Sequence, residues 1–399
     1  MSFSQGLSGL NAASQKLSVI GNNIANLGTV GFKSSAVSFA DVYANSRVGL
    51  GVQVASVNQD FSTGAIISTG NQFDVAIDGP TGLFRVEDSN GRVLYTRNGQ
   101  FHADKNNFIV NAQGQRLTGY AVGTTNLMPI KVPVGNIEPL ATTNIDYKVN
   151  LDANAAVVTV PFDATDPSTF SFSSPITVFD SLGNQHSLIE YFTKRPAVSG
   201  DSAWDVNFTV DGATPTSGAN TTLAFDTAGR LITAPPIHTV GVTNPGGPSS
   251  PAAPLNITVD YTDSTQFGGD YTQNFTQNGY ATGEYTSMSI SDNGSIIANY
   301  TNGQIKDVGT LALADFNNLQ GLKPVGGNAW VETAASGQPI LGQPGSNGLA
   351  NIKSQAVEKS NVDMSQELVH MIIAQRAYQA NAKTIETQDQ ILQTLITMR

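Results

Sequence analysis

Apolar positions near the N-terminus recur at the spacing of an amphipathic helix. From Leu10 to Leu27 the apolar residues are separated by three or four positions, which places their side chains on one face. The sequence therefore predicts a helix over residues 1–28, with a packing face formed by Phe3, Leu10, Leu17, Ile20, Ile24 and Leu27. Gly28 follows the last apolar position and is expected to end the helix in the left-handed conformation.

The C-terminus carries a second and longer pattern of the same kind, over residues 361–399. Gln375 and Asp389 are the polar exceptions in its apolar seam. Ser360 or Asn361 is expected to cap the start of this helix, and Asp363 places a negative charge in its first turn. The predicted packing face consists of Met364, Leu368, Met371, Tyr378, Ile385, Leu392 and Ile396.

The residues between these helices follow a different pattern, which is typical of antiparallel strands. From residue 73 to 120, short apolar runs alternate with turn signals such as Asp78-Gly79, Asn90-Gly91 and Asn98-Gly99. Such signals at intervals of about 8 to 12 residues favour hairpins in a sandwich or barrel. Further strand-like segments occupy 177–179, 186–192, 204–210, 257–261 and 285–290.

Helices at both ends of a β-rich chain can pack together only if the β domains are inserted between them. We therefore predict a multidomain α+β fold. Long heptad helices form a coiled-coil-like core, and two nested, mainly antiparallel β domains (sandwich or barrel) lie between them in sequence. The predicted divisions are a terminal helical assembly domain (1–28 and 361–399), a connecting segment (29–72 and 349–360), a discontinuous first β domain (73–145 and 281–348) and an inserted second β domain (146–280). Residues 29–72 are rich in Gly, Ser, Val and Asn, and we hypothesise that they form a joint ordered only in a polymer.

Charge and cysteine content exclude several classes of function. The chain has 399 residues with 20 Lys and Arg against 31 Asp and Glu, so its formal net charge is −11. Nucleic-acid binding rests on a basic surface, which this composition does not provide. The chain has no cysteine, and its N-terminus lacks the apolar core of a cleaved secretory signal.

The sequence gives only weak evidence for catalytic or metal-binding residues. The four histidines, at positions 102, 186, 238 and 370, are scattered and form no paired metal-ligand motif. Asp74 and Asp78 could be imagined as a glycosidase carboxylate pair, and Asp88 as part of a calcium loop, but turn chemistry explains each more simply. We predict no enzyme activity, no cofactor, no metal site and no small-molecule substrate.

Two motifs at opposite ends of the chain resemble the signatures of the bacterial flagellar rod and hook protein family. The N-terminal motif comprises Asn22, Asn23, Ile24, Ala25 and Asn26, followed by Gly31, Phe32 and Lys33. The C-terminal motif comprises Asn361, Val362 and Asp363, followed by Gln375, Arg376, Ala377 and Tyr378. From periodicity alone, a helical hairpin inside a monomer is the favoured interpretation of the terminal helices. The family motifs favour a polymer instead.

Within this family, residues 73–79, 95–99 and 117–120 are similar to the first β domain of the hook branch. This resemblance implies a structural subunit that leaves the cell unfolded through the flagellar type III export apparatus and joins the hook of the flagellar basal body outside the cell. There it would polymerise into a curved, flexible helical tube, a universal joint that transmits motor torque from rod to filament. The implied partners are many copies of the chain itself and the rod, hook-cap and hook-filament junction proteins. The alternatives are a distal rod protein or, from another class, a β-rich carbohydrate-binding or carbohydrate-active protein.

Overall fold

The structure is a computed structural model that describes residues 3–42, 49–198 and 200–397. Its chain divides into two compact units. The first comprises 1–134, 287–299 and 305–399, and the second comprises 135–286 and 300–304. The outermost residues of both predicted terminal helices (1–2 and 398–399) and part of the predicted connecting segment (43–48) lie outside the described residues.

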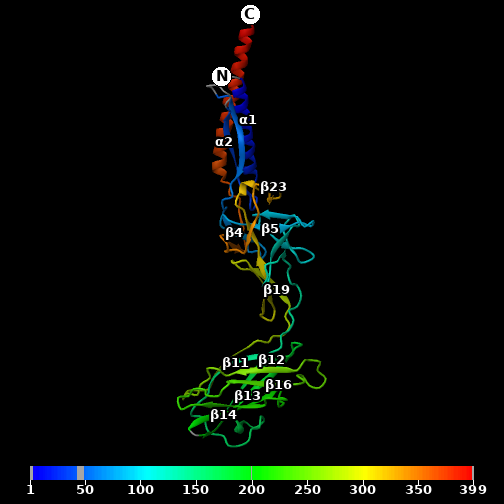
Figure 1. Ribbon diagram of the computed structural model, residues 1–399, viewed down its shortest axis with the longest axis vertical. Helices are drawn as coiled ribbons and strands as arrows, with labels where there is room; N and C mark the ends of the chain where they lie inside the picture. Colours follow the sequence, from blue (N-terminus) through cyan, green and yellow to red (C-terminus); the bar gives the residue numbers. More distant parts are fainter. Residues whose placement is uncertain (1–2, 43–48, 199, 398–399) are drawn as a thin grey trace. The chain divides into compact units, whose positions relative to one another are not determined.

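Two long helices lie at the ends of the chain, as the periodicity predicts. Helix α1 spans Phe3–Ala25 and helix α2 spans Met364–Thr397, and the two lie side by side within the first unit (Figure 1). The middle of the chain is mostly β-structure. The coarse prediction of terminal helices around a β-rich middle is therefore confirmed.

The helix ends differ in detail from the prediction. Helix α1 ends at Ala25, and Gly31 rather than Gly28 takes a left-handed conformation, at φ 70°. At the start of α2 the capping residue is Asp363, whose Oδ1 accepts hydrogen bonds from the backbone N–H of Ser365 (2.8 Å) and Gln366 (3.1 Å). A carboxylate acceptor suits this position because it also meets the positive end of the helix dipole. The expected caps, Ser360 and Asn361, have other contacts.

A β-hairpin follows α1 in the predicted connecting segment. Strands β1 (Ser35–Val42) and β2 (Gly51–Gln59) pair in antiparallel register, with an irregularity between Ser38 and Phe39, and both strands contact α1. The segment thus contains regular structure within a single chain.

The remaining strands of the first unit form one large sheet and two short antiparallel pairs. Eight strands give the main path of the thirteen-stranded sheet, in the order β19-β20-β21-β9-β5-β6-β24-β23. The short pairs join early and late parts of the chain, β4 with β26 and β3 with β27. The elements before the insertion are β3 (Ile66–Ser68), β4 (Val75–Asp78), β5 (Leu83–Glu87), β6 (Val93–Thr96), β7 (His102–Ala103), β8 (Ile109–Val110), β9 (Arg116–Ala121) and β10 (Leu127–Pro129). Those after it are β19 (Tyr285–Ile290), β20 (Ser295–Tyr300), β21 (Ile305–Leu311), β22 (Leu313–Asp315), the 3-10 helix η2 (Leu319–Gly321), β23 (Lys323–Gly326), β24 (Ala329–Val331), β25 (Ile340–Gly342), β26 (Asn351–Ser354) and β27 (Ala356–Glu358).

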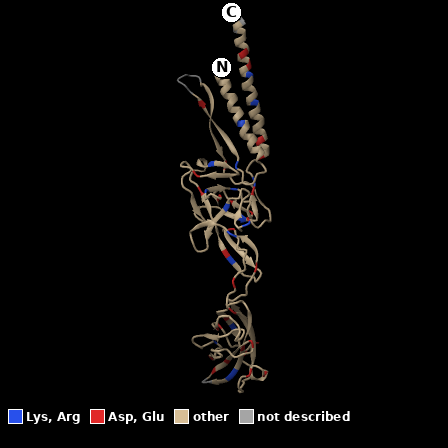
Figure 2. Cartoon of the chain, turned by 90° about the vertical axis from the view of Figure 1, so that its right-hand side faces the viewer, with Lys and Arg blue, Asp and Glu red and all other residues tan. Residues whose placement is uncertain are grey.

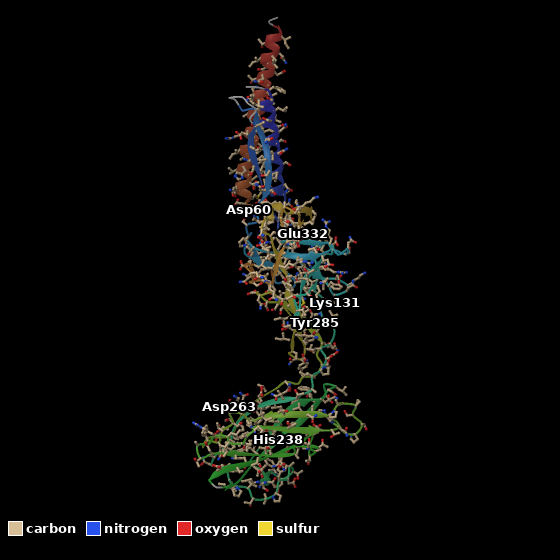
Figure 3. The ribbon with its side chains drawn as sticks, viewed as in Figure 1. Asp60, Lys131, His238, Asp263, Tyr285 and Glu332 are labelled. Atoms are coloured by element: carbon tan, nitrogen blue, oxygen red, sulfur yellow. The ribbon has the colours of Figure 1, made fainter. Side chains whose placement is uncertain are left out.

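Aromatic side chains anchor part of the core of this first unit. The rings of Phe61 and Trp330 lie 5.4 Å apart, and Tyr95 packs edge-on against Phe316 at 4.8 Å. The Tyr95 hydroxyl donates a hydrogen bond to Glu332 (3.0 Å), which is labelled in Figure 3. Residues from before and after the insertion therefore build one core.

The second unit contains two four-stranded sheets that share a hydrophobic core. Their strand orders are β12-β13-β14-β15 and β16-β17-β11-β18, and only β11 with β17 pairs in parallel. Trp204, Phe192 and Tyr147 are fully buried in this core. The elements are β11 (Asn144–Asn150), the 3-10 helix η1 (Pro167–Thr169), β12 (Phe172–Phe179), β13 (Gln185–Val198), β14 (Asp201–Val210), β15 (Asn220–Phe225), β16 (Ile237–Val242), β17 (Leu255–Asp260) and β18 (Thr272–Gln277).

Candidate functional site

Small residues allow the two terminal helices to approach each other closely. A Cβ atom added to Gly9 would lie 2.6 Å from Oδ1 of Asn381, and one added to Gly6 would lie 3.0 Å from Cγ1 of Ile385. Asn381 is held on α2 by a hydrogen bond from its Nδ2 to the carbonyl of Ala377 (2.9 Å). The intramolecular helix contact thus rests in part on glycines, which the apolar periodicity does not reveal.

Much of the apolar surface of the two helices is left uncovered within one chain. Of the predicted packing-face residues, only Ile20 is buried, at 4% exposure. Leu10, Leu17, Ile24, Leu27, Met371 and Ile385 are half-buried, whereas Phe3, Met364, Leu368, Tyr378, Leu392 and Ile396 are exposed. Sequence reasoning missed a further exposed group on α2, which comprises Val369, Ile372, Ile373 and Ile391. Apolar surface of this extent is typical of an interaction site.

Asn23 joins α1 to the hairpin and to α2. Its side-chain amide donates to the carbonyl of Ser35 (2.9 Å), and its Oδ1 accepts from the backbone N–H of the same residue (2.9 Å). The amide also donates to Glu367 on α2 (3.1 Å). Because Asn23 is almost completely buried, its amide provides hydrogen-bond partners for backbone groups of Ser35 at a place that water does not reach.

The other asparagines of the N-terminal motif shape the turn after α1. The Asn26 amide donates to the backbone carbonyl of Asn22 (2.9 Å), and its Oδ1 accepts from the hydroxyl of Thr29 (3.1 Å). Ile24 is half-buried and Ala25 is exposed at the helix end. These contacts stabilise the turn that leads the chain from the helix toward the β-sheets.

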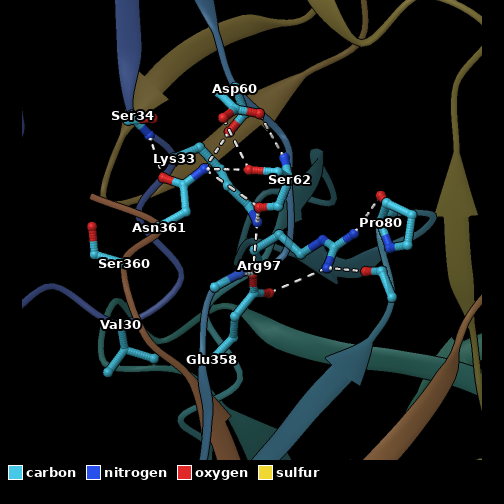
Figure 4. Close-up of polar contacts among 12 residues, drawn as sticks. Val30, Lys33, Ser34, Asp60, Ser62, Pro80, Arg97, Glu358, Ser360 and Asn361 are labelled. Atoms are coloured by element: carbon cyan, nitrogen blue, oxygen red, sulfur yellow. Dashed lines mark hydrogen bonds and ion pairs between the residues drawn. The ribbon is translucent and has the colours of Figure 1, made fainter. Parts of the chain in front are cut away.

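A buried charged cluster lies where the segments after α1 and before α2 meet the sheets (Figure 4). The Glu358 carboxylate accepts from the Lys33 ammonium (2.6 Å), from the Arg97 guanidinium (3.2 Å) and from the backbone N–H of Gly64 (2.8 Å). All three charged side chains are at most 1% exposed. We call Lys33, Arg97 and Glu358 the junction triad.

Backbone carbonyls accept further hydrogen bonds from the two cations, although the buried Nε of Arg97 has no partner among the described residues. Lys33 also donates to the carbonyl of Ser62 (2.6 Å), and Arg97 donates to those of Gly79 (2.9 Å) and Pro80 (2.7 Å). Burial lowers the pKa of both Lys33 and Arg97, and the Glu358 carboxylate opposes this change in each case. Removing the carboxylate would therefore leave two buried cations without their counter-charge.

Two further motif residues hold the same junction together. Oδ1 of Asn361 accepts from the backbone N–H of Ser34 (2.8 Å), and its amide donates to the carbonyl of Asp60 (2.8 Å), a residue also labelled in Figure 3. Gly31 has a positive φ, and a Cβ added there would lie 2.6 Å from the backbone of Arg97. Only glycine fits such a close approach without strain.

The structure separates the remaining motif residues, beyond those at the end of α1 and the cap Asp363, into two groups. Lys33, Gly31 and Asn361 meet at the junction, where Val362 is buried and Phe32 is half-buried. Gln375, Arg376, Ala377 and Tyr378 lie exposed on α2 and take no part in the junction. Sequence reasoning did not identify Glu358 or Arg97. Glu358 could have been suspected as the only charged residue in the apolar segment 356–358.

The weak catalytic candidates have structural roles. The Asp74 carboxylate accepts from Thr69 (2.7 Å) and Asn71 (3.1 Å), and Asp88 accepts from the backbone N–H of Asn90 (2.8 Å) and Arg92 (3.0 Å). Both aspartates thus serve turns, as predicted. Within 3–42, 49–198 and 200–397, no group of three or more His, Asp or Glu residues is arranged to hold a metal ion, and neither helix is apolar enough to cross a membrane.

Comparison with known families gives four consecutive matches along the chain. Residues 5–33 match the flagella basal body rod protein family, and residues 76–165 match the D1 domain of flagellar hook protein FlgE/F/G. Residues 150–280 match the D2 domain of flagellar basal body protein FlaE, and residues 353–398 match the C-terminal region of flagellar basal body rod FlgEFG proteins.

Full-length relatives and a solved structure agree with these matches. The chain is 43% identical to the flagellar hook protein FlgE of Escherichia coli and 32% identical to that of Borreliella burgdorferi, with 99–100% of each chain covered. The crystal structure of Helicobacter pylori flagellar hook protein FlgE2 matches with a TM-score of 0.54 at 16% identity, over 73% of this chain and 99% of that one, which supports the fold alone. The chain belongs to the flagellar hook protein family, whose members are structural proteins of the bacterial flagellum.

Proposed function

We propose that this chain is a subunit of the bacterial flagellar hook that assembles with copies of itself through α1 and α2. The observation that carries the proposal is the exposed apolar surface of these helices in a chain whose full length resembles hook proteins. At roughly 25 cal/mol per Å², covering such side chains is a strong driving force for association. The assembly is a curved helical tube that transmits torque from rod to filament as a universal joint.

The proposed division of labour follows the predicted domains. Residues 1–28 and 361–399 form the coiled-coil-like assembly core, 29–72 and 349–360 connect it to the sheets, and 73–145 with 281–348 form the first β domain around the inserted domain 146–280. The four family matches, at 5–33, 76–165, 150–280 and 353–398, support this division. The further partners of the proposed hook subunit are the rod, hook-cap and hook-filament junction proteins, and the type III apparatus exports the unfolded chain.

Assembly through α2 can be tested by placing charges on its exposed apolar residues. The double variant Leu368→Glu, Ile372→Glu changes side chains that are 42% and 50% exposed, so the fold of the single chain is retained. We expect negative-stain electron microscopy to show curved tubes for the native chain and none for this variant at equal concentration.

A matched control places the same charges at exposed polar positions of the same helix, in the double variant Gln379→Glu, Gln390→Glu. Tubes from the Leu368 and Ile372 variant would refute the assembly role of this surface. Straight native tubes would indicate a rod component rather than a hook.

A further inference from the structure

The net charge of the chain is confined to the second unit. Residues 135–286 and 300–304 contain 15 Asp and Glu against four Lys and Arg, a formal net charge of −11. The first unit contains 16 of each, so its net charge is zero. Figure 2 colours the positions of Lys and Arg blue and those of Asp and Glu red along the chain.

Three of the four cations of the second unit are engaged, and the fourth, Arg230, is exposed. Lys148 pairs with Asp263 (2.7 Å) and Arg195 with Asp205 (2.6 Å), while Lys194 donates to the backbone carbonyl of Ala153 (2.6 Å). Within 135–198, 200–286 and 300–304, most of the acidic groups therefore have no Lys or Arg partner in their own unit, although His186 contacts Asp180 and Asp211, and many of the acidic groups lie at the surface.

Turn geometry explains why the second unit tolerates aspartate at many turns, but it does not explain why aspartate is used there in place of the uncharged asparagine. Six aspartates of the second unit accept a hydrogen bond from the backbone N–H two residues later: Asp152, Asp163, Asp166, Asp180, Asp226 and Asp260. Asparagine fills this position equally well, as the first unit shows, where Asn71, Asn98, Asn111 and Asn293 accept the same bond alongside Asp60, Asp88 and Asp104. The aspartates thus add charge beyond what the turns require.

The helices that carry the exposed apolar surface are nearly neutral by comparison. Helix α1 contains one charged residue, Lys16, and α2 contains Arg376 and Lys383 against three acidic residues. The apolar surface that would drive association and the excess negative charge therefore lie in separate parts of the sequence.

We propose that repulsion between the second units of neighbouring copies opposes the association that the terminal helices drive, so that ionic strength regulates assembly through the second unit. The inference rests on the proposed self-assembly. Like charges on exposed surfaces repel over the Debye length, which is about 30 Å at 0.01 M salt and about 3 Å at 1 M. Salt thus weakens the repulsion while it leaves the apolar contact between helices in place.

The test compares two full-length triple variants that each remove three exposed negative charges. The second-unit variant is Glu138→Gln, Asp270→Asn, Glu284→Gln, and the control in the first unit is Asp78→Asn, Asp292→Asn, Asp307→Asn. The protein concentration at which tubes form is measured by sedimentation and electron microscopy over about 0.01 to 1 M NaCl.

At low salt we expect the second-unit variant to assemble at a concentration lower by on the order of threefold than the native chain, and the two to converge at high salt. The control should not assemble more readily than the native chain. An equal gain in both variants, or native assembly that is independent of salt, would overturn the proposal.

Failure of the proposed function is distinguishable from failure of this inference. If neither the native chain nor any variant forms tubes, self-assembly is refuted, and the repulsion is then measured on dissolved chains by static light scattering. A second virial coefficient that is positive in dilute salt, falls as salt is added and is smaller for the second-unit variant supports repulsion. One that is insensitive to salt refutes it.

Discussion

A glutamate in the centre of the second unit makes the stability of that unit dependent on pH. Glu190 lies on β13 between the buried Leu188 and Phe192, and its own side chain is fully buried. Neither carboxylate oxygen has a hydrogen-bond partner among the described residues, and the same holds for the nearby hydroxyls of Ser174 and Tyr261. Burial raises the pKa of Glu190 from 4.5 to about 8, an effect that Tyr261 partly opposes. The folded chain thus keeps this carboxyl protonated at neutral pH.

The size and sign of the effect follow from the two pKa values. Below pH 4.5 the carboxyl is protonated in both the folded and the unfolded chain, and its ionisation contributes nothing to stability. Between pH 4.5 and about 8 only the folded chain holds the proton, so stability falls as pH rises. At about 1.36 kcal/mol per pH unit, the loss reaches roughly 3 kcal/mol at pH 7 and levels off near 5 kcal/mol above pH 8.

Glu190→Gln removes this pH dependence, because the amide is uncharged and has nearly the shape of the neutral acid. We expect the variant to match the native chain at pH 4.5 and to be more stable by about 3 kcal/mol at pH 7. The chain has two tryptophans, Trp204 in the second unit and Trp330 in the first. In a Trp330→Phe background, fluorescence therefore reports denaturant unfolding of the second unit alone.

The matched control for this experiment is Glu284→Gln, which removes an exposed carboxylate from the same unit. Its unfolding free energy should follow that of the native chain at every pH. An equal pH dependence for Glu190→Gln and the native chain would show that Glu190 is ionised in the folded state, and the reasoning would fail.

Two further predictions concern the first unit and the start of α2. Lys33→Met removes one of the two cations that bind the buried Glu358 carboxylate and should cost about 3 to 5 kcal/mol, measured from Trp330 fluorescence in denaturant, with the exposed Lys353→Met as control. A loss below about 1 kcal/mol would refute the structural role of the triad. Asp363→Ala removes the cap of α2 and should cost about 1 kcal/mol in the same assay, whereas Asp363→Asn keeps the acceptor and should cost less.

The terminal helices could be predicted from the sequence because the periodicity of their apolar residues is a local property. Steps of three and four between Leu10 and Leu27 report a helix face whatever that face contacts. The same periodicity could not show that Gly6 and Gly9 allow α2 to approach closely, since glycine has no hydropathy signal. It also left open which apolar residues the partner helix covers.

Contacts between residues that are distant in sequence could not be predicted from local sequence patterns. The pairing of Lys33 with Glu358 joins residues 325 positions apart, and no local pattern links them. Glu190 is a different case, because strict alternation places it on the same strand face as Leu188 and Phe192. A charged residue at an inward position of a strand is a visible signal, and it was overlooked in a segment recognised only as a strand.

The junction triad also sets the order in which parts of the chain can fold when the chain becomes available from its N-terminus onward. The second unit is nearly continuous in sequence and can fold once residues 135–304 are available. Lys33 and Arg97 must wait for Glu358, and strands β3 and β4 must wait for β27 and β26. Helix α1 likewise meets its partner only when the last residues arrive. A truncated or partly delivered subunit therefore lacks a closed junction and a paired helix, so completeness of the chain is itself a condition for presenting the assembly surface.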